Sequence, residues 1–153
     1  DLHTLIEKTL ETFQAEFDEA GMAVVMDGDP TGPDVNGDPS RLRHAIEALI
    51  RNAIQYSPHG GTLRVTVGKV GGEALIVFQD EGVGISKRDL SRVFERFFRG
   101  RPVDDKGHTI DVRGMGQGLY AVKSIVEAHQ GDVSIESEPQ RGTKVTIRLP
   151  VRG

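Results

Sequence analysis

A hairpin in the middle of the chain limits the folds that this sequence can adopt. The segments TLRVTVGKV (residues 62–70) and EALIVFQD (residues 73–80) are rich in residues that strands favour, and only Gly71 and Gly72 separate them. A two-residue glycine connection joins antiparallel strands, whereas parallel strands need a long crossover. The sheet is therefore expected to contain at least one antiparallel pair.

Helices and strands follow one another irregularly on both sides of this hairpin. Apolar spacing predicts helices over residues 2–20, 39–56, 87–98 and 119–130, and further strands over 22–27, 132–137 and 143–150. Gly21 ends the first helix, Asp38 with Pro39 opens the second, and Ser86 caps the third. Separate helices beside hairpin-joined strands indicate an α+β fold, a two-layer sandwich with three main helices on one face of a mixed, largely antiparallel sheet.

Composition narrows the class of partner. The 153 residues suit one domain with a real core, and the net charge of −4 argues against nucleic acid or an anionic membrane surface as the main partner. There is no cysteine, which excludes disulfides and thiolate chemistry. The longest apolar runs fall well short of the roughly 20 residues of a membrane helix. Because the first residues already follow a helical pattern and no Met precedes them, we expect a fragment of a larger protein.

The strand over 73–80 ends on a carboxylate in the stretch DEGVGI. Asp80 is followed by Gly82 and Gly84, and glycine is placed where φ is positive or where another group approaches the backbone closely. Taken alone, this stretch is equally an ordinary turn. Its meaning depends on the motifs around it.

An amide lies among the apolar residues of the second helix. Asn52 shares a helical side with Ala48, Gln55 and Tyr56. A buried amide needs a partner, and its carbonyl oxygen suits Mg²⁺, whereas an amide near a helix end can equally be half-exposed.

A second glycine cluster, GMGQGL, leads directly into the last helix. Gly114, Gly116 and Gly118 could turn backbone N–H groups toward an anion at the helix N-terminus, although a flexible loop explains them as well. The spacing is neither that of a Rossmann motif nor that of a P-loop. Between the two clusters lies RVFERFFRG, whose phenylalanines have core-like spacing and whose Arg99 could reach a triphosphate.

The order of these motifs carries more weight than any one of them. An internal Asn, then Asp-x-Gly-x-Gly, a Phe-rich segment, Gly-x-Gly-x-Gly-Leu and a closing GTKVTIRLP together resemble the catalytic ATP-binding domain of bacterial sensor histidine kinases. This fold, the Bergerat fold, is shared with gyrase, the mismatch-repair ATPase and the ninety-kilodalton heat-shock chaperone. The resemblance covers the chain from about residue 38 to residue 150, and it implies a single domain over residues 1–153 that binds ATP and Mg²⁺.

The resemblance assigns a role to each matching residue. It implies that Asn52 binds Mg²⁺ and that Asp80 accepts a hydrogen bond from the adenine amine, with Gly82 and Gly84 letting the purine lie against the backbone. Arg99 matches the basic residue near the γ-phosphate, and a lid over the nucleotide is implied across about residues 99–114. The remaining matches line the adenine slot (Tyr56, Ile85 and Thr143) or the phosphate end (Gly114, Gly116, Gly118 and Leu119).

Two positions depart from the family pattern. Histidine kinases often carry another Asn four residues before the metal-binding one, where this chain has Ala48, and many have Lys or Arg in place of Gln55. Hydrolytic relatives place a general-base Glu at the Ala48 position. Here Glu47 lies about 100° round the helix and is placed to pair with Arg51. We therefore expect weakened but surviving nucleotide affinity, and phosphotransfer rather than direct ATP hydrolysis.

The resemblance implies that the phosphoryl acceptor is a histidine on a separate dimerisation domain of the same parent, with a response regulator engaged indirectly. His3 is followed by Thr rather than by Glu or Asp, so the fragment alone is not expected to autophosphorylate. The other histidines show no metal-ligand spacing and are expected mostly on the surface (His44, His59, His108 and His129). A cytoplasmic location is implied, without direct membrane contact by this domain and whether or not the parent is membrane-anchored.

Two other functions stay open on the sequence. Ala48 and Gln55 allow a degenerate nucleotide-binding module that transmits conformation without phosphotransfer. A serine kinase of the anti-sigma type would use the same fold on a protein hydroxyl.

Overall fold

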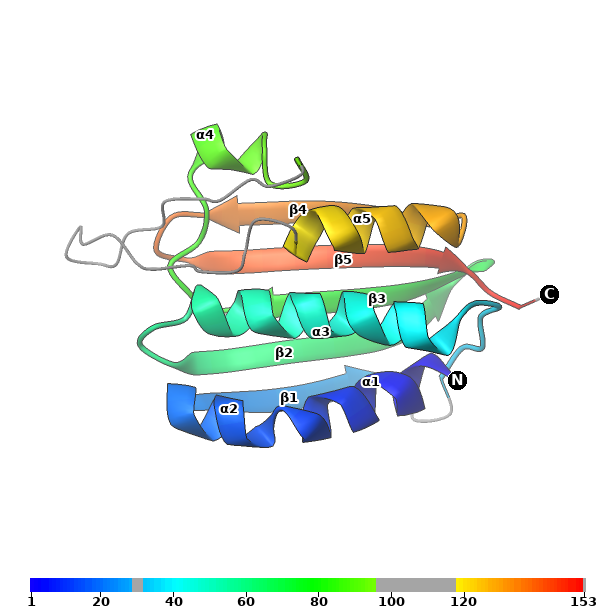
Figure 1. The fold of residues 1–153 in the computed structure, drawn as a ribbon, viewed down its shortest axis with the longest axis horizontal. Coiled ribbons are helices and arrows are strands. Elements are labelled where there is room, and N and C mark those ends of the chain that lie inside the picture. Colours follow the sequence, from blue (N-terminus) through cyan, green and yellow to red (C-terminus); the bar gives the residue numbers. More distant parts are fainter. Residues whose placement is uncertain (29–31, 96–117, 153) are drawn as a thin grey trace.

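The computed structural model describes residues 1–28, 32–95 and 118–152. They form one five-stranded sheet with the strand order β1-β2-β3-β5-β4 (Figure 1). The strands are β1 (Met22–Gly28), β2 (Gly61–Val70), β3 (Glu73–Asp80), β4 (Asp132–Glu138) and β5 (Gly142–Pro150). Only β1 and β2 run parallel among these strands, so the expectation of a mixed, largely antiparallel sheet is confirmed.

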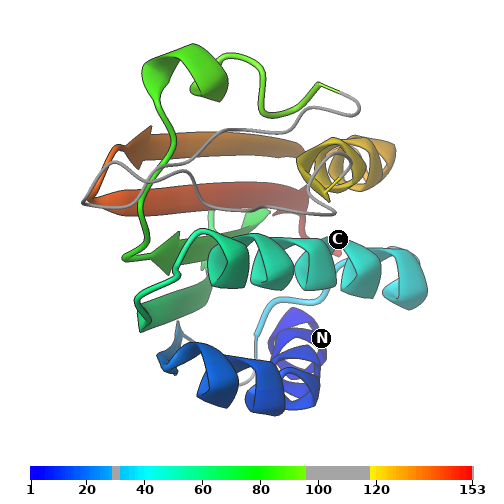
Figure 2. The same cartoon turned by 60° about the vertical axis from the view of Figure 1, so that its left-hand side comes forward.

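The main helices cover one face of this sheet. They are α1 (Leu2–Thr12), α2 (Gln14–Ala20), α3 (Pro39–Gln55) and α5 (Gly118–Ala128), with a short α4 (Lys87–Leu90) beside β4 (Figures 1 and 2). The buried sides of the strands alternate as the pleat requires, for example Leu63, Val65 and Val67 on β2. These side chains meet the apolar stripes of α3 and α5 in one continuous core, which confirms the two-layer α+β sandwich.

The first helix is broken where the sequence predicted one continuous helix. Phe13 separates α1 from α2 with φ −102° and ψ 8°, and Gly21 ends α2 in the left-handed conformation. Just before the break, the hydroxyls of Thr9 and Thr12 donate to the carbonyls of Leu5 and Thr9. Such bonds compete with the helical ladder and bend helices, and here the break leaves Phe13 in the core.

The helix predicted over residues 87–98 is much shorter than expected. Ser86 caps it as predicted, its hydroxyl accepting from the N–H of Asp89, but α4 ends at Leu90. Ser91 then donates its hydroxyl to the carbonyl of Arg88, and residues 91–95 form turns with bonds between residues three apart. Residues 96–98 lie outside the described part of the chain.

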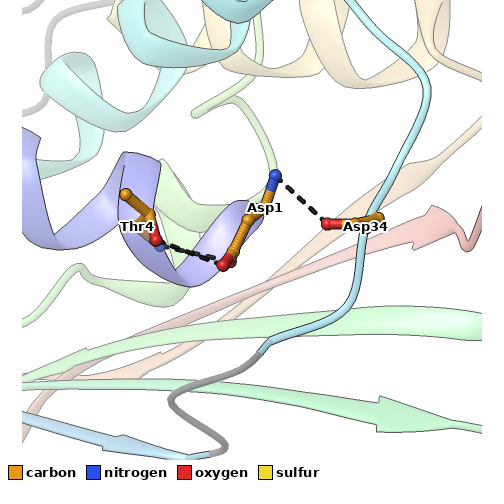
Figure 3. A network of polar contacts seen from close by, with 3 residues as sticks. All are labelled: Asp1, Thr4 and Asp34. Atoms are coloured by element: carbon orange, nitrogen blue, oxygen red, sulfur yellow. Dashed lines mark hydrogen bonds and ion pairs between the residues drawn. The ribbon is translucent and has the colours of Figure 1, made fainter.

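Polar contacts fix the start of α1 (Figure 3). Asp1 caps the helix by accepting from the N–H and the hydroxyl of Thr4, while its amino group lies 3.3 Å from the carboxylate of Asp34. Independently of that amino group, the N–H of Leu2 donates to the carbonyl of Pro33 at 3.2 Å and holds the loop that leads into α3 against the first helix. Among the described helices, none combines the length and the apolar character needed to cross a membrane.

His129 joins α5 to α3 instead of lying free on the surface. Its Nδ1–H donates to the carbonyl of Ile125 at 2.7 Å, and its Nε2 accepts from the N–H of Asp38 at 3.1 Å. Because a carbonyl only accepts and an amide N–H only donates, these two partners define the tautomer of the ring. Among the histidines expected mostly on the surface, His129 is an exception, since it is half-buried at the start of α3.

Replacing His129→Ala should lower the free energy of unfolding by about 1–2 kcal/mol, because two hydrogen bonds are lost and the Asp38 N–H loses its acceptor. Urea titration followed by circular dichroism measures the change. His44→Ala, at an exposed position on α3, is the matched control and should stay within about 0.5 kcal/mol of the original chain. Equal effects of the two substitutions would contradict the structural role of His129.

Candidate nucleotide site

Five chain segments meet at one edge of the sheet. These are the C-terminal end of α3, the ends of β3 and β4 and the start of β5, which lie on the left in Figure 1, and the start of α5, which lies nearer the middle and packs beside α3. The sheet register places Asp80, the last residue of β3, opposite Thr143 near the start of β5. Most of the predicted site residues in the described part of the chain belong to these segments or to the loop that follows Asp80.

Asp80 is a buried carboxylate held by backbone donors. Its side chain lies among residues that leave it only 6% exposed, and Oδ1 accepts from the N–H of Gly82 at 2.9 Å and of Thr143 at 3.3 Å. Burial raises the pKa of Asp80 to about 6, and the two N–H donors partly oppose that increase. Oδ2 accepts no hydrogen bond from the described residues, so this oxygen is available to a ligand.

The loop from Asp80 to Ile85 is clamped between α3 and the β4–β5 turn. The N–H of Val83 donates to the carbonyl of Tyr56 at 2.8 Å, and the carbonyl of Val83 accepts from the N–H of Gln140 at 2.6 Å. Residues 82–85 are all buried. The carboxylate is therefore presented by a rigid segment and not by a mobile turn.

The two glycines of this loop are required by the close packing of neighbouring backbone segments. A Cβ on Gly82 would overlap the carbonyl of Tyr56, and a Cβ on Gly84, whose φ is +73°, would overlap the carbonyl of Glu138. From the sequence, Gly82 and Gly84 were expected to let a purine lie against the backbone. The structure shows that each allows the close approach of another backbone segment.

Tyr56 ends α3 beside this loop. Its side chain is buried, and burial, with a smaller contribution from the negative charge of Asp89, raises the pKa of the Tyr56 hydroxyl to about 12. The phenol is therefore neutral at physiological pH. Tyr56 and Ile85 thus lie with Asp80 at the same edge, as the sequence predicted.

Asn52 lies one turn before Tyr56 on α3, and its side chain is only 3% exposed. Its Oδ1 is buried and has no hydrogen-bond partner among the described residues. An orphaned buried carbonyl oxygen costs free energy unless a ligand completes it, and a hard cation such as Mg²⁺ takes this kind of oxygen. Elsewhere in residues 1–28, 32–95 and 118–152, no cluster of His, Cys, Asp or Glu could hold a metal ion.

The phosphate end of the predicted site is described only in part. Gly118 is the first residue of α5, and no described atom lies within 4 Å of where its Cβ would be, while Leu119 is buried against the core. The other predicted residues of this end, Arg99, Gly114 and Gly116, and the lid across 99–114 lie outside the described residues.

Two hydroxyls of the site were missed by sequence reasoning. Ser57 follows Tyr56, and its buried Oγ lies beside Gly82 without a hydrogen-bond partner among the described residues. Ser137 on β4 contacts both Ile85 and Thr143. The alternation along β4 could have identified Ser137, because it lies on the same inward side of the strand as Val133 and Ile135.

One predicted contact near the site is wrong. Glu47 and Arg51 were expected to pair one turn apart, but no ion pair joins them among the described residues. The guanidinium of Arg51 instead lies 5.4 Å from the ring centre of Phe13, a cation–π contact that ties α3 to the break between α1 and α2. The side chains of Arg51 and Phe13 line a cavity of about 410 Å³ between α3 and the break in the first helix.

The raised pKa of Asp80 makes a prediction about stability. Since each pKa unit corresponds to about 1.4 kcal/mol, keeping Asp80 ionised costs the ligand-free fold up to about 3 kcal/mol at neutral pH. Asp80→Asn should therefore raise the free energy of unfolding at pH 7.5. The stabilisation should shrink as the pH falls from about 6 to about 4, where both the folded and the unfolded wild-type carboxyl become protonated.

Urea unfolding at a series of pH values checks this prediction, with Asp18→Asn on the exposed side of α2 as the matched control. A pH-independent difference between wild type and Asp80→Asn would contradict the desolvated carboxylate.

Comparison with known proteins identifies the family of this chain. Residues 37–153 match the family described as histidine kinase-, DNA gyrase B- and HSP90-like ATPase. The sensor-like histidine kinase SenX3 of Mycolicibacterium smegmatis is 35% identical over 150 residues, which are 98% of this chain but 38% of SenX3. The chain thus spans little more than a third of the length of that relative.

Solved structures agree with the sequence match. The mycobacterial sensor histidine kinase MprB superposes with a TM-score of 0.84 at 30% identity, covering 99% of this chain and 97% of the MprB chain. Full-length ShkA in complex with AMPPNP has the same fold, with a TM-score of 0.80 at 22% identity over 99% of this chain and 30% of ShkA. The chain belongs to the histidine kinase-, gyrase- and HSP90-like ATPase family, as a catalytic ATP-binding domain of the sensor histidine kinase type.

Proposed function

We propose that this domain binds Mg·ATP at the edge formed by α3, the Asp80 loop and the start of α5, and presents the γ-phosphate to a histidine of another domain. The observation that carries the proposal is the pairing of two unsatisfied oxygens on neighbouring segments. Asn52 Oδ1 is buried without a hydrogen-bond partner among the described residues, and Asp80, also a buried residue, uses only Oδ1 for its two hydrogen bonds and leaves Oδ2 for a ligand. One oxygen suits an amine donor and the other suits a cation.

The base is recognised at the Asp80 end. An ionised carboxylate accepts a hydrogen bond from the exocyclic amine of adenine, and such charge-assisted bonds are stronger than neutral ones. Because the loop from Asp80 to Ile85 is clamped on both sides, little ordering cost remains when the base binds. Tyr56, Ile85 and Thr143 complete the walls of this end.

The metal is held at the Asn52 end. Asn52 Oδ1 would supply one oxygen ligand to Mg²⁺, and the bound ion would neutralise charge on the triphosphate. Gly118 and Leu119 at the start of α5 belong to the phosphate side in this proposal, together with Gly114, Gly116 and Arg99, and residues 99–114 act as the lid. AMPPNP bound to ShkA, which has the same fold, is consistent with this ligand class.

The acceptor is a histidine of a dimerisation domain in the same parent protein, and a response regulator follows indirectly. SenX3, a sensor-like histidine kinase, extends well beyond the matched region, which leaves room for such domains. Transfer to an imidazole needs no activated water, and Ala48 stands where hydrolytic relatives have a general-base Glu. Positioning and charge neutralisation supply the catalysis. We place the whole chain, as one catalytic domain, in the cytoplasm where ATP and response regulators are found.

Asp80→Asn should lower the affinity for Mg·ATP by about 10- to 100-fold, because a hydrogen bond to a charged group contributes about 1.5–3 kcal/mol. Isothermal titration calorimetry at pH 8, where Asp80 is ionised, measures the loss. The same substitution is expected to stabilise the ligand-free fold, and the urea titrations described above check that lost binding does not come from unfolding. Binding equal to wild type would remove the assignment of Asp80 to the base.

Mixing the domain with the dimerisation domain of its parent and γ-labelled ATP should transfer label to histidine, in an acid-labile form. Asn52→Ala should abolish the transfer by removing the metal ligand, whereas Asn36→Ala, the same change in an exposed loop, should not. Acid-stable label would instead indicate a serine kinase. ATP binding without any label would indicate a module that only transmits conformation, consistent with Ala48 and Gln55.

A further inference from the structure

A cluster of hydrogen bonds centred on Ser137 lies beside the base end of the site. Ser137 Oγ accepts from the N–H of Ile85 at 2.7 Å and donates to the carbonyl of Gly142 at 2.9 Å. The same oxygen lies 2.9 Å from Oγ1 of Thr143, which is only 3% exposed. One hydroxyl on β4 therefore joins the Asp80 loop to the start of β5.

Counting protons in this cluster fixes the role of each hydroxyl. The amide of Ile85 can only donate, and the carbonyl of Gly142 can only accept. The single proton of Ser137 goes to Gly142, so the proton in the contact with Thr143 must come from Thr143. The Thr143 hydroxyl then has no proton left for a ligand, and toward the site it can act only as an acceptor.

Thr143 is also tied to the carboxylate that reads the base. Its backbone N–H donates to Oδ1 of Asp80 at 3.3 Å, and the two residues are paired across β3 and β5. The base end thus combines a carboxylate and a hydroxyl whose proton is already used. Both groups present lone pairs and neither presents a donor.

We propose that Ser137 is a positioning residue for base selection, which keeps the Thr143 hydroxyl an acceptor so that the site takes a 6-aminopurine and rejects a 6-oxopurine. This inference rests on the proposed nucleotide site. A 6-amino group brings two N–H donors to these acceptors, whereas a 6-oxo group brings another acceptor and leaves the buried oxygens unpaired. Sites that hydrogen-bond a substrate group discriminate strongly against analogues that cannot form the bond.

Removing the Ser137 hydroxyl should alter selectivity through Thr143. In Ser137→Ala the Thr143 proton loses its acceptor, so the Thr143 hydroxyl becomes free to rotate and to donate to a 6-oxo group. The affinity for Mg·ITP should then rise relative to that for Mg·ATP, reducing the discrimination by about 10-fold, equivalent to about 1.4 kcal/mol. If Ser137 had a purely structural role, Ser137→Ala would lower the affinities for Mg·ATP and Mg·ITP equally.

Calorimetric competition at pH 8 with Mg·ATP and Mg·ITP tests this in wild type, Ser137→Ala, Thr143→Val and the double variant. Ser137→Ala should bring the ratio of the dissociation constants for Mg·ITP and Mg·ATP closer to one. In the Thr143→Val background, adding Ser137→Ala should not change this ratio further. Ser134→Ala, on the exposed side of the same strand, is the matched control and should leave the ratio unchanged. Should Ser137→Ala not fold, Ser137→Cys keeps a weaker donor and acceptor and should narrow the ratio partially.

The outcomes separate the two proposals. An unchanged ratio in the Ser137 variants, or a change that persists in the Thr143→Val background, overturns the role of Ser137 while leaving nucleotide binding intact. If wild type binds neither nucleotide, the proposed function itself fails, and the inference fails with it.

Discussion

The desolvated carboxylate of Asp80 is the constraint on which the candidate site depends. A buried charge is costly, and this fold supports it with two backbone N–H groups from different segments, one in its own loop and one on β5. Those donors exist only if the loop from Asp80 to Ile85 passes close to α3 and to the β4–β5 turn. The close approach in turn excludes a side chain at positions 82 and 84.

The same arrangement explains why the site is costly for the fold on its own. Burial raises the pKa of Asp80, so its ionised form is costly at neutral pH, and Asn52 and Ser57 each bury an oxygen that no described group satisfies. A sequence selected for stability alone would have apolar or paired groups at these positions. Unsatisfied polar atoms gathered at one edge are typical of a binding site whose ligand completes them.

The architecture could be predicted from sequence because its patterns are local. The glycine hairpin, the Asp38 cap and the alternation along each strand depend on neighbouring residues, and the strands and main helices lie close to their predicted places. The break at Phe13 and the early end of α4 were missed, because threonine and serine hydroxyls compete there with the helical ladder. Of the candidate site, Asp80, Asn52 and Tyr56 were predicted through motif order, and their roles stay predictions. The roles of Gly82, Gly84 and Ser137 depend on which distant backbone segments meet, and no local pattern contains that information.

The bond between His129 and Asp38 lies at the end of α3 and α5 that is remote from the candidate site (Figure 1). Because the bond joins α3 and α5 at one end, a change in the angle between these helices moves their opposite ends furthest apart. Since α3 is 17 residues and so about 25 Å long, a change of about 5° in the angle between the helices moves the opposite end by about 2 Å. His129 therefore ties the two helices together at the end remote from Asn52 and Tyr56, where any change in the angle between the helices would displace the backbone most.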